Sequence, residues 1–228
     1  MVDIALRGEL WDNDSADVLR WYGWRDITAP MDIAEALEKA GGDDVTLLIN
    51  SPGGDMAVGA EIRSMLRRYS GKTTALFQGY GASSATLAAS ACTTIQSEPG
   101  ALLCYHNPSS VANGDYRDMR ISAEALENAR NCILEMYMAR SGTKSREELI
   151  ELMDKNIWIS PTQAKDFGLI DDIVGLDEES SDPAAFVAAS NGRIRLTSAM
   201  RQKYQDHVMG EREKVQHALA RIHSLVNY

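Results

Sequence analysis

Segments with β-strand patterns alternate with amphipathic helical segments over the first 78 residues of the chain. Continuous apolar stretches such as 45–49 are typical of strands that are buried on both faces, so we expect this one to lie centrally. The alternation predicts repeated βαβ units, and therefore an α/β fold with a mostly parallel sheet covered by helices. The predicted strands are 4–7, 45–50 and 73–78, and the predicted helices are 31–39 and 56–69.

The same kinds of pattern continue to about residue 175. Ser122 precedes a long apolar stripe with helical spacing, which predicts a helix that begins there. Ser145 and Glu148 form a capping-box pattern and predict the start of another helix. The remaining predicted elements are helices at 83–91, 125–140 and 161–167 and strands at 93–96 and 102–105.

The composition divides the chain into three parts. Residues 1–175 carry the strand and helix patterns and predict one globular domain. Residues 176–195 are rich in Asp, Glu, Ser, Pro and Ala, which is typical of a linker. Residues 196–228 repeat apolar residues at helical spacing, which predicts a C-terminal amphipathic helix. That helix either packs on its own domain or serves as an arm for oligomerisation or partner binding.

Charge and hydropathy exclude several classes of function. The formal net charge of -10 would repel nucleic acid, and no segment collects enough Lys and Arg to offset it. No apolar stretch approaches the roughly 20 residues that a membrane span needs. The first residues lack the pattern of a signal peptide, so we expect a cytoplasmic protein without membrane contact. The three cysteines, Cys92, Cys104 and Cys132, are not spaced as metal ligands, and we expect them to be reduced core residues.

Two glycine-rich turns each follow a predicted buried strand. The first, 50–55, contains Gly53 and Gly54, which allow a sharp turn and leave backbone N–H groups free at a helix start. The second, 79–84, places Ser83 at the beginning of a helix, where negative charge is favoured. Together the turns could hold a nucleophile and the donors that stabilise an oxyanion.

Each of these features has an ordinary structural explanation when taken alone. Serine is a common helix N-cap, so Ser83 could simply cap its helix. His106 follows an apolar strand, where a histidine is often structural, but it is the one imidazole outside the C-terminal segment and hence the candidate base. Cys104, two residues away on the same predicted strand, is a weaker alternative nucleophile.

The order of these motifs resembles the ClpP family of serine proteases. The first turn, Asn50–Gly54, is followed after 24 residues by the second, Gly79–Ser83, and then by His106. The segment 158–171 also resembles the closing helix and strand of the family, so that the similarity covers about three quarters of the chain. Within the family the chain is most similar to the ClpP-like head-maturation proteases of tailed phages, a resemblance to which the Trp158 segment and the 115–120 stretch contribute.

The resemblance implies a crotonase-like fold of repeated ββα/βαβ units and a set of catalytic roles. Ser83 would be the nucleophile, His106 the general base, and the N–H groups of Gly54 and Ser84 the oxyanion hole. The third residue of the family's catalytic triad is an acid, and here the sequence departs from the pattern, because Asn156 occupies that position. An amide can orient an imidazole but stabilises an imidazolium less well than a carboxylate does.

Two neighbours of Asn156 are alternatives for the third role. Asp154 could act as the acid if the segment shifts, and Lys155 offers a fainter Ser–Lys pairing. With any of these assignments, the resemblance implies hydrolysis of peptide bonds through an acyl-enzyme, without a metal ion or an organic cofactor.

The resemblance also implies a homo-oligomeric ring, with ring-to-ring contacts along helix 125–140. In a phage, the protein substrates would be capsid and scaffold proteins, processed in the host cytoplasm or inside the assembling procapsid. Two other functions stay open at this point. One is an acyl-CoA enzyme of the same superfold, and the other is a catalytically weak or silent assembly protein, which Asn156 makes credible.

Overall fold

The computed structural model describes residues 2–140 and 144–175. The predicted linker 176–195 and the predicted helix 196–228 lie outside the described residues.

The described chain is built on a parallel seven-stranded sheet. The main path runs β2-β1-β3-β4-β5-β7, while β6 pairs with β4. The strand 45–50 is therefore central, as predicted, although Leu48 in its middle is only half-buried. The strands are β1 Val2–Leu10, β2 Ile27–Thr28, β3 Val45–Gly54, β4 Thr73–Ala82, β5 Thr94–Ser97, β6 Leu102–Cys104 and β7 Asp172–Ile173.

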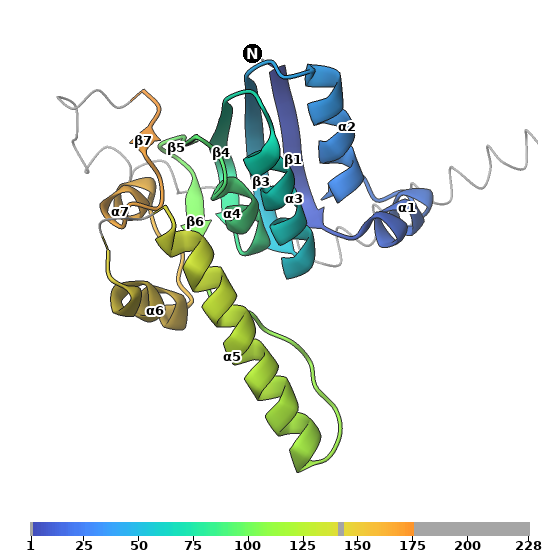
Figure 1. Cartoon of the computed structure of the whole chain (residues 1–228), viewed down its shortest axis with the longest axis vertical. Helices are drawn as coiled ribbons and strands as arrows, with labels where there is room; N and C mark the ends of the chain where they lie inside the picture. The colour runs from blue at the N-terminus through green and yellow to red at the C-terminus, as the bar shows by residue number, and fades with distance from the viewer. Residues whose placement is uncertain (1, 141–143, 176–228) are drawn as a thin grey trace, which may run out of the picture. The chain divides into compact units, whose positions relative to one another are not determined.

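Helices cover one face of this sheet (Figure 1). The connections from β1 to β3, β4 and β5 all progress in the same direction, so right-handed crossovers place their helices on the same side. In β1, Ile4 and Leu6 are buried beneath this layer, whereas Ala5 and Arg7 on the other face are exposed. The helices are α1 Asn13–Trp21, α2 Pro30–Ala40, α3 Met56–Arg68, α4 Ser84–Ala89, α5 Tyr116–Met138, α6 Arg146–Lys155 and α7 Pro161–Asp166.

Strand β4 carries two partners along one edge. Its first half pairs with β5, and its end pairs with β6, so that Tyr80 lies opposite Leu102. The turn 98–101 joins the two partners and returns the chain to the same edge. On its other side, β6 forms an antiparallel bridge between Leu103 and Ile159. This arrangement brings the end of β6 beside the end of β4.

Helix α5 begins earlier than the sequence pattern predicted. Its N-cap is Asp115, whose carboxylate accepts from the backbone of Arg117 and forms a capping box with Asp118. The prediction of a start after Ser122 was wrong because the first turns have no apolar stripe and depend on this cap instead.

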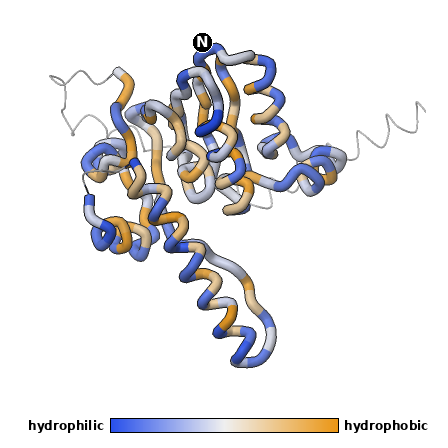
Figure 2. The backbone as a smooth tube through the Cα atoms, in the orientation of Figure 1, coloured by the Kyte–Doolittle hydropathy of each residue, from blue (hydrophilic) through white to orange (hydrophobic). Residues whose placement is uncertain are grey.

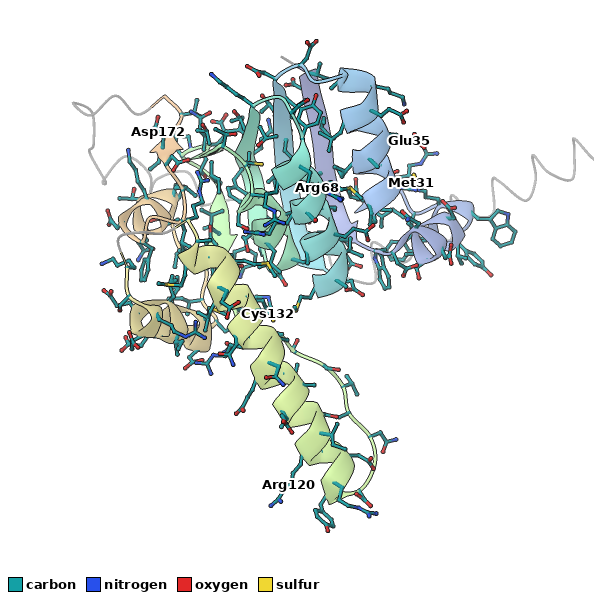
Figure 3. All side chains as sticks on the ribbon, viewed as in Figure 1. Met31, Glu35, Arg68, Arg120, Cys132 and Asp172 are labelled. Atoms are coloured by element: carbon teal, nitrogen blue, oxygen red, sulfur yellow. The ribbon has the colours of Figure 1, made fainter. Side chains whose placement is uncertain are left out.

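The first part of α5 projects from the sheet and its helices (Figure 1). Its buried residues, Ile133, Leu134 and Tyr137, all lie near its C-terminal end. Figure 2 shows apolar residues among the polar ones of the projecting part, and Figure 3 places Arg120 near its tip and Cys132 closer to the sheet. The connection from β6 returns alongside the helix to its first residue.

Two negative observations apply to the residues that the structure describes. None of the helices there combines the length and hydropathy of a membrane span. Nor does the described part contain a cluster of three or more His, Cys, Asp or Glu side chains arranged to bind a metal ion.

Candidate active site

A cavity of about 300 Å³ opens where β3, β4 and β6 end. Residues from both glycine-rich turns line it, together with His106, the histidine that the sequence singled out. Parallel sheets characteristically place their sites at the carboxyl ends of the strands, because the connecting loops converge there. The lining consists of Gly54, Asp55, Met56, Ser83, Ser84, Leu87, His106, Asn107, Pro108, Ser109, Ile133 and Tyr137.

Ser83 has an unusual backbone conformation for a residue with a side chain. Its φ is 55° and its ψ is −132°, a combination that only glycine adopts without strain. Its N–H donates to the carbonyl of Cys104 at 3.0 Å, and its carbonyl accepts from Thr86 N at 2.9 Å. Although Ser83 is the N-cap residue of α4, its side chain makes no capping hydrogen bond. The hydroxyl is therefore not used to cap the helix.

Gly53 permits the close approach of the two turns. Its φ is 89°, and a Cβ atom built on it would lie 2.6 Å from the Cβ of Ser83 and 2.9 Å from the backbone nitrogen of Ser84. Any other residue here would push the second turn away, so the glycine sets the separation between the turns.

Two residues that line the cavity beside Ser83, Gly54 and Ser84, have backbone N–H groups that are candidates for stabilising an oxyanion. The N–H of Asp55 donates to Leu10 on β1 at 3.0 Å, and successive N–H groups of a strand alternate sides, so the N–H of Gly54 points toward the β4 side. Ser84 is the first residue of α4, where a helix provides no acceptor for the N–H group. The N–H of Ser83 is already bonded, which leaves Gly54 and Ser84 as the candidate oxyanion donors.

A buried hydrogen-bond chain supports the serine from the helical side. Thr86 Oγ1 donates to the Ser83 carbonyl at 2.6 Å and lies 2.6 Å from the hydroxyl of Tyr137. The single hydroxyl proton of threonine is used toward the carbonyl, so Tyr137 is the donor in the second bond. Burial raises the pKa of Tyr137 and keeps it protonated as this donor.

His106 lies in the pocket lining, just beyond the end of β6. Its Nδ1 is 2.7 Å from the backbone oxygen of Asn107. A carbonyl only accepts, so Nδ1 carries the proton and Nε2 is the basic nitrogen. Within the described ranges, no hydrogen bond joins the imidazole to Ser83 Oγ, so the structure brings the candidate nucleophile and the candidate base into one cavity without a hydrogen bond between them.

The structure separates the two main candidates for the third role. Asn156 is the C-cap of α6 in a left-handed conformation, exposed and outside the cavity lining, with Oδ1 3.9 Å from the sulfur of Cys104. Asp154 accepts a hydrogen bond from Asn107 Nδ2 at 2.7 Å and so reaches the residue next to His106. The pairing of Asn156 with His106 stays a prediction.

The weaker alternatives find little support in the geometry. Lys155 lies 3.9 Å from Glu151 in an exposed pair on α6. Burial raises the pKa of the Cys104 thiol, which opposes formation of a nucleophilic thiolate. All three cysteines are free, as expected, but Cys132 is exposed on α5, so the prediction that every cysteine lies in the core was wrong.

Sequence reasoning missed the residues that support the site. Asn107 directly follows His106 and could have been noticed for that reason. Thr86 lies three residues after Ser83, at a spacing where a helix-start hydroxyl can reach back to the chain. Tyr137 gave no local signal of this role, because it reaches the site from a distant turn of α5.

The fold and the cavity define an α/β protein with a serine and a histidine at the carboxyl edge of a parallel sheet. A family model described as Clp protease matches residues 25–177. The chain therefore belongs to the Clp protease family.

Individual relatives show how far the similarity extends. The ATP-dependent Clp protease proteolytic subunit 3 of Streptomyces avermitilis is 31% identical over 133 residues, which are 58% of this chain and 60% of the relative. Subunit 1 of Chlamydia abortus is 25% identical over 167 residues, 72% of this chain and 81% of the relative. The chain thus spans only about 60% of the length of the first Streptomyces relatives.

A solved structure supports the fold. An asparagine-to-aspartate variant of ClpP1 from Listeria monocytogenes matches with a TM-score of 0.61 and 21% identity, covering 77% of this chain and 92% of that one. The mostly parallel ClpP-like fold implied by the sequence motifs is thereby confirmed. At this identity the likeness concerns the fold alone.

Proposed function

We propose that the chain is a serine endopeptidase that hydrolyses peptide bonds through an acyl-enzyme at Ser83. One observation carries this proposal: Ser83 is held in a strained conformation at a cavity that is also lined by His106, Gly54 and Ser84. Strain of this kind persists only where the surrounding structure enforces it, and it is concentrated at functional sites.

The proposed reaction follows from these positions. Ser83 Oγ attacks the substrate carbonyl carbon while its proton passes to Nε2 of His106. The negative charge that develops on the carbonyl oxygen accepts hydrogen bonds from the N–H groups of Gly54 and Ser84. The C–N bond then breaks, the amine leaves with the proton from His106, and a water molecule hydrolyses the resulting ester by the same steps.

The absence of an imidazole–hydroxyl bond is compatible with this chemistry. Catalytic hydrogen bonds are often long or misaligned in unliganded sites and tighten when substrate binds. The anchored backbone of Ser83 limits how far the nucleophile can move, so the adjustment falls on His106, which lies in the connection after β6.

We further propose that the active form is a homo-oligomeric ring and that the substrates are capsid and scaffold proteins of a tailed phage. The projecting helix α5 supports a role in assembly, because most of its length makes no contribution to the core. The phage substrates rest on the resemblance of the 115–120 and Trp158 segments to head-maturation proteases. Mass spectrometry of a candidate scaffold protein incubated with the chain and with its Ser83→Ala variant tests this assignment.

A serine-directed fluorophosphonate probe tests the catalytic proposal. We expect Ser83→Ala to abolish labelling, because the nucleophile is removed. Ser84→Ala is the matched control and should keep most of the labelling, because its proposed contribution is a backbone N–H. Labelling that is lost in Ser84→Ala and kept in Ser83→Ala would show that the nucleophile has been assigned to the wrong residue.

A further inference from the structure

A polar cluster joins the chain after His106 to helices α5 and α6. Asn107 Nδ2 donates to Asp154 Oδ1 at 2.7 Å, and Arg130 Nη2 lies 3.7 Å from the same oxygen. The backbone oxygen of Asn107 accepts from Nδ1 of His106 at 2.7 Å. A continuous path of polar contacts therefore runs from Arg130 on α5, through Asp154 on α6, to the imidazole.

We infer that Asn107 and Asp154 position His106. The Asn107 carbonyl fixes the imidazole tautomer and the Asp154 carboxylate fixes the Asn107 side chain. This inference rests on the proposed function, and it gives Asp154 a different task from that of a triad acid. The carboxylate acts one residue away, through its hydrogen bond with Asn107.

The backbone carbonyl of Asn107 orients the His106 imidazole, which is one of the two tasks of the acid in a catalytic triad. In a triad, the acid accepts from Nδ1–H and keeps Nε2 free as the base. Here the backbone oxygen accepts that proton, which serves the same purpose without a charge at this atom. Asn156, at the acid position of the family pattern, has its side-chain oxygen near Cys104.

The orientation of the Asn107 side chain follows from its partner. A carboxylate only accepts hydrogen bonds, so the amide must turn its NH₂ group toward Asp154. The amide oxygen then faces inward, where it is buried without a partner. Arg130 Nε is also buried without a partner, so the cluster holds one spare acceptor and one spare donor.

The connection between β6 and α5 follows directly after His106. Near that residue, the hydrogen bond between Asn107 and Asp154 anchors it to helix α6. Pro108 follows directly and restricts the backbone of Asn107. From Ser109 to Gly114 the side chains are exposed and offer little packing. Loss of the bond therefore frees the residue that carries the accepting carbonyl, and the imidazole loses its fixed orientation.

Labelling kinetics at Ser83 provide the first test. The rate constant for fluorophosphonate labelling should fall about tenfold in Asn107→Ala and in Asp154→Ala, as expected for loss of one charge-assisted hydrogen bond. The double variant should be scarcely slower than either single variant, because both remove the same bond. Glu151→Ala, one turn earlier on α6, is the matched control and should label at the wild-type rate.

An exchange of donor and acceptor makes the test specific. Asn107→Asp alone places two carboxylates together and should also slow labelling. Combined with Asp154→Asn, it re-forms the hydrogen bond with the polarity reversed, and the rate should return to within about threefold of wild type. Thermal midpoints should stay within a few degrees throughout, because a positioning role changes the rate and not the fold.

The outcomes separate this inference from the proposed function. Wild-type labelling rates in both single variants, or losses that multiply in the double variant, would overturn the positioning role while leaving Ser83 as nucleophile. An absence of Ser83-dependent labelling in the wild type would overturn the proposed function instead. In that case ¹⁵N chemical shifts still test the tautomer: His106 should be protonated at Nδ1 in the wild type and show mixed tautomers in Asp154→Ala.

Discussion

Ser83 shows how backbone strain and chemistry meet at one residue. Its positive φ is imposed from three directions, by the bond from its N–H to Cys104, the bonds from Thr86 to its carbonyl, and the bare Cα of Gly53. Strained conformations of this kind cost about 1–3 kcal/mol each. The packing of the surrounding core offsets that cost, and the strained backbone places Ser83 in the cavity lining.

The Ser83→Gly variant should therefore be more stable than the Ser83→Ala variant. Glycine adopts this conformation freely, and we expect the free energy of unfolding to rise by about 1 kcal/mol relative to Ser83→Ala, after allowance for the greater entropy of glycine in the unfolded chain. Urea unfolding of the Ser83→Gly and Ser83→Ala variants measures the difference. Because the Ser83 side chain does not cap α4, Ser83→Ala itself should show no capping loss. A less stable Ser83→Gly variant would mean that Ser83 is not strained.

The two ends of helix α5 are stabilised by different interactions. Its C-terminal part is held by burial of Leu134 and Tyr137, whereas its first turns depend on the Asp115 cap. Isolated helical turns are marginal in water, so local interactions decide how the projecting part behaves.

Asp115→Ala should loosen the start of α5 without affecting the core. We expect a local loss of about 1 kcal/mol, seen as faster amide hydrogen exchange over residues 116–120. Exchange at Leu134 and the thermal midpoint should not change. Glu127→Gln, an exposed change in the middle of the same helix, serves as the control and should leave exchange at 116–120 unaltered.

For the whole molecule, sequence patterns predicted most of the sheet and the two glycine turns, because burial and turn chemistry are local properties. They also isolated Ser83 and His106. The supporting contacts escaped prediction because they join distant segments: Asn107 and Asp154 are 47 residues apart, and Thr86 and Tyr137 are 51 apart. The strands and helices of 2–21 and 27–40 were only partly predicted, since α1 buries only the small residue Ala16 and β2 is two residues long.

Buried thiol and phenol groups make the fold sensitive to alkali. Burial raises the pKa of Cys92 from 9.0 to about 11 and also raises those of Tyr105 and Tyr137. Each group is ionised more readily in the unfolded chain, so its contribution is complete below its unfolded pKa and is lost as pH rises toward the folded value. We expect roughly 3 kcal/mol to be lost through Cys92 between pH 9 and 11.

Urea unfolding at several pH values measures this loss. The free energy of unfolding should be flat up to about pH 8 and should fall steadily above pH 9. Cys92→Ala should start lower, because it leaves a small cavity, but should show a shallower decline. An equal decline in Cys92→Ala and wild type would show that other groups control the alkaline transition.

The projecting part of α5 also has a consequence for how activity depends on protein concentration. Val111 in the connection before the helix, and Tyr116 and Ile121 in its first turns, expose large apolar side chains, and this connection leads back to His106. A second copy that covers these side chains would order the connection on which the base depends, so assembly and competence of the site are linked by mass action. Dilution would then abolish the proposed activity by dissociating the proposed oligomer while each chain keeps its fold.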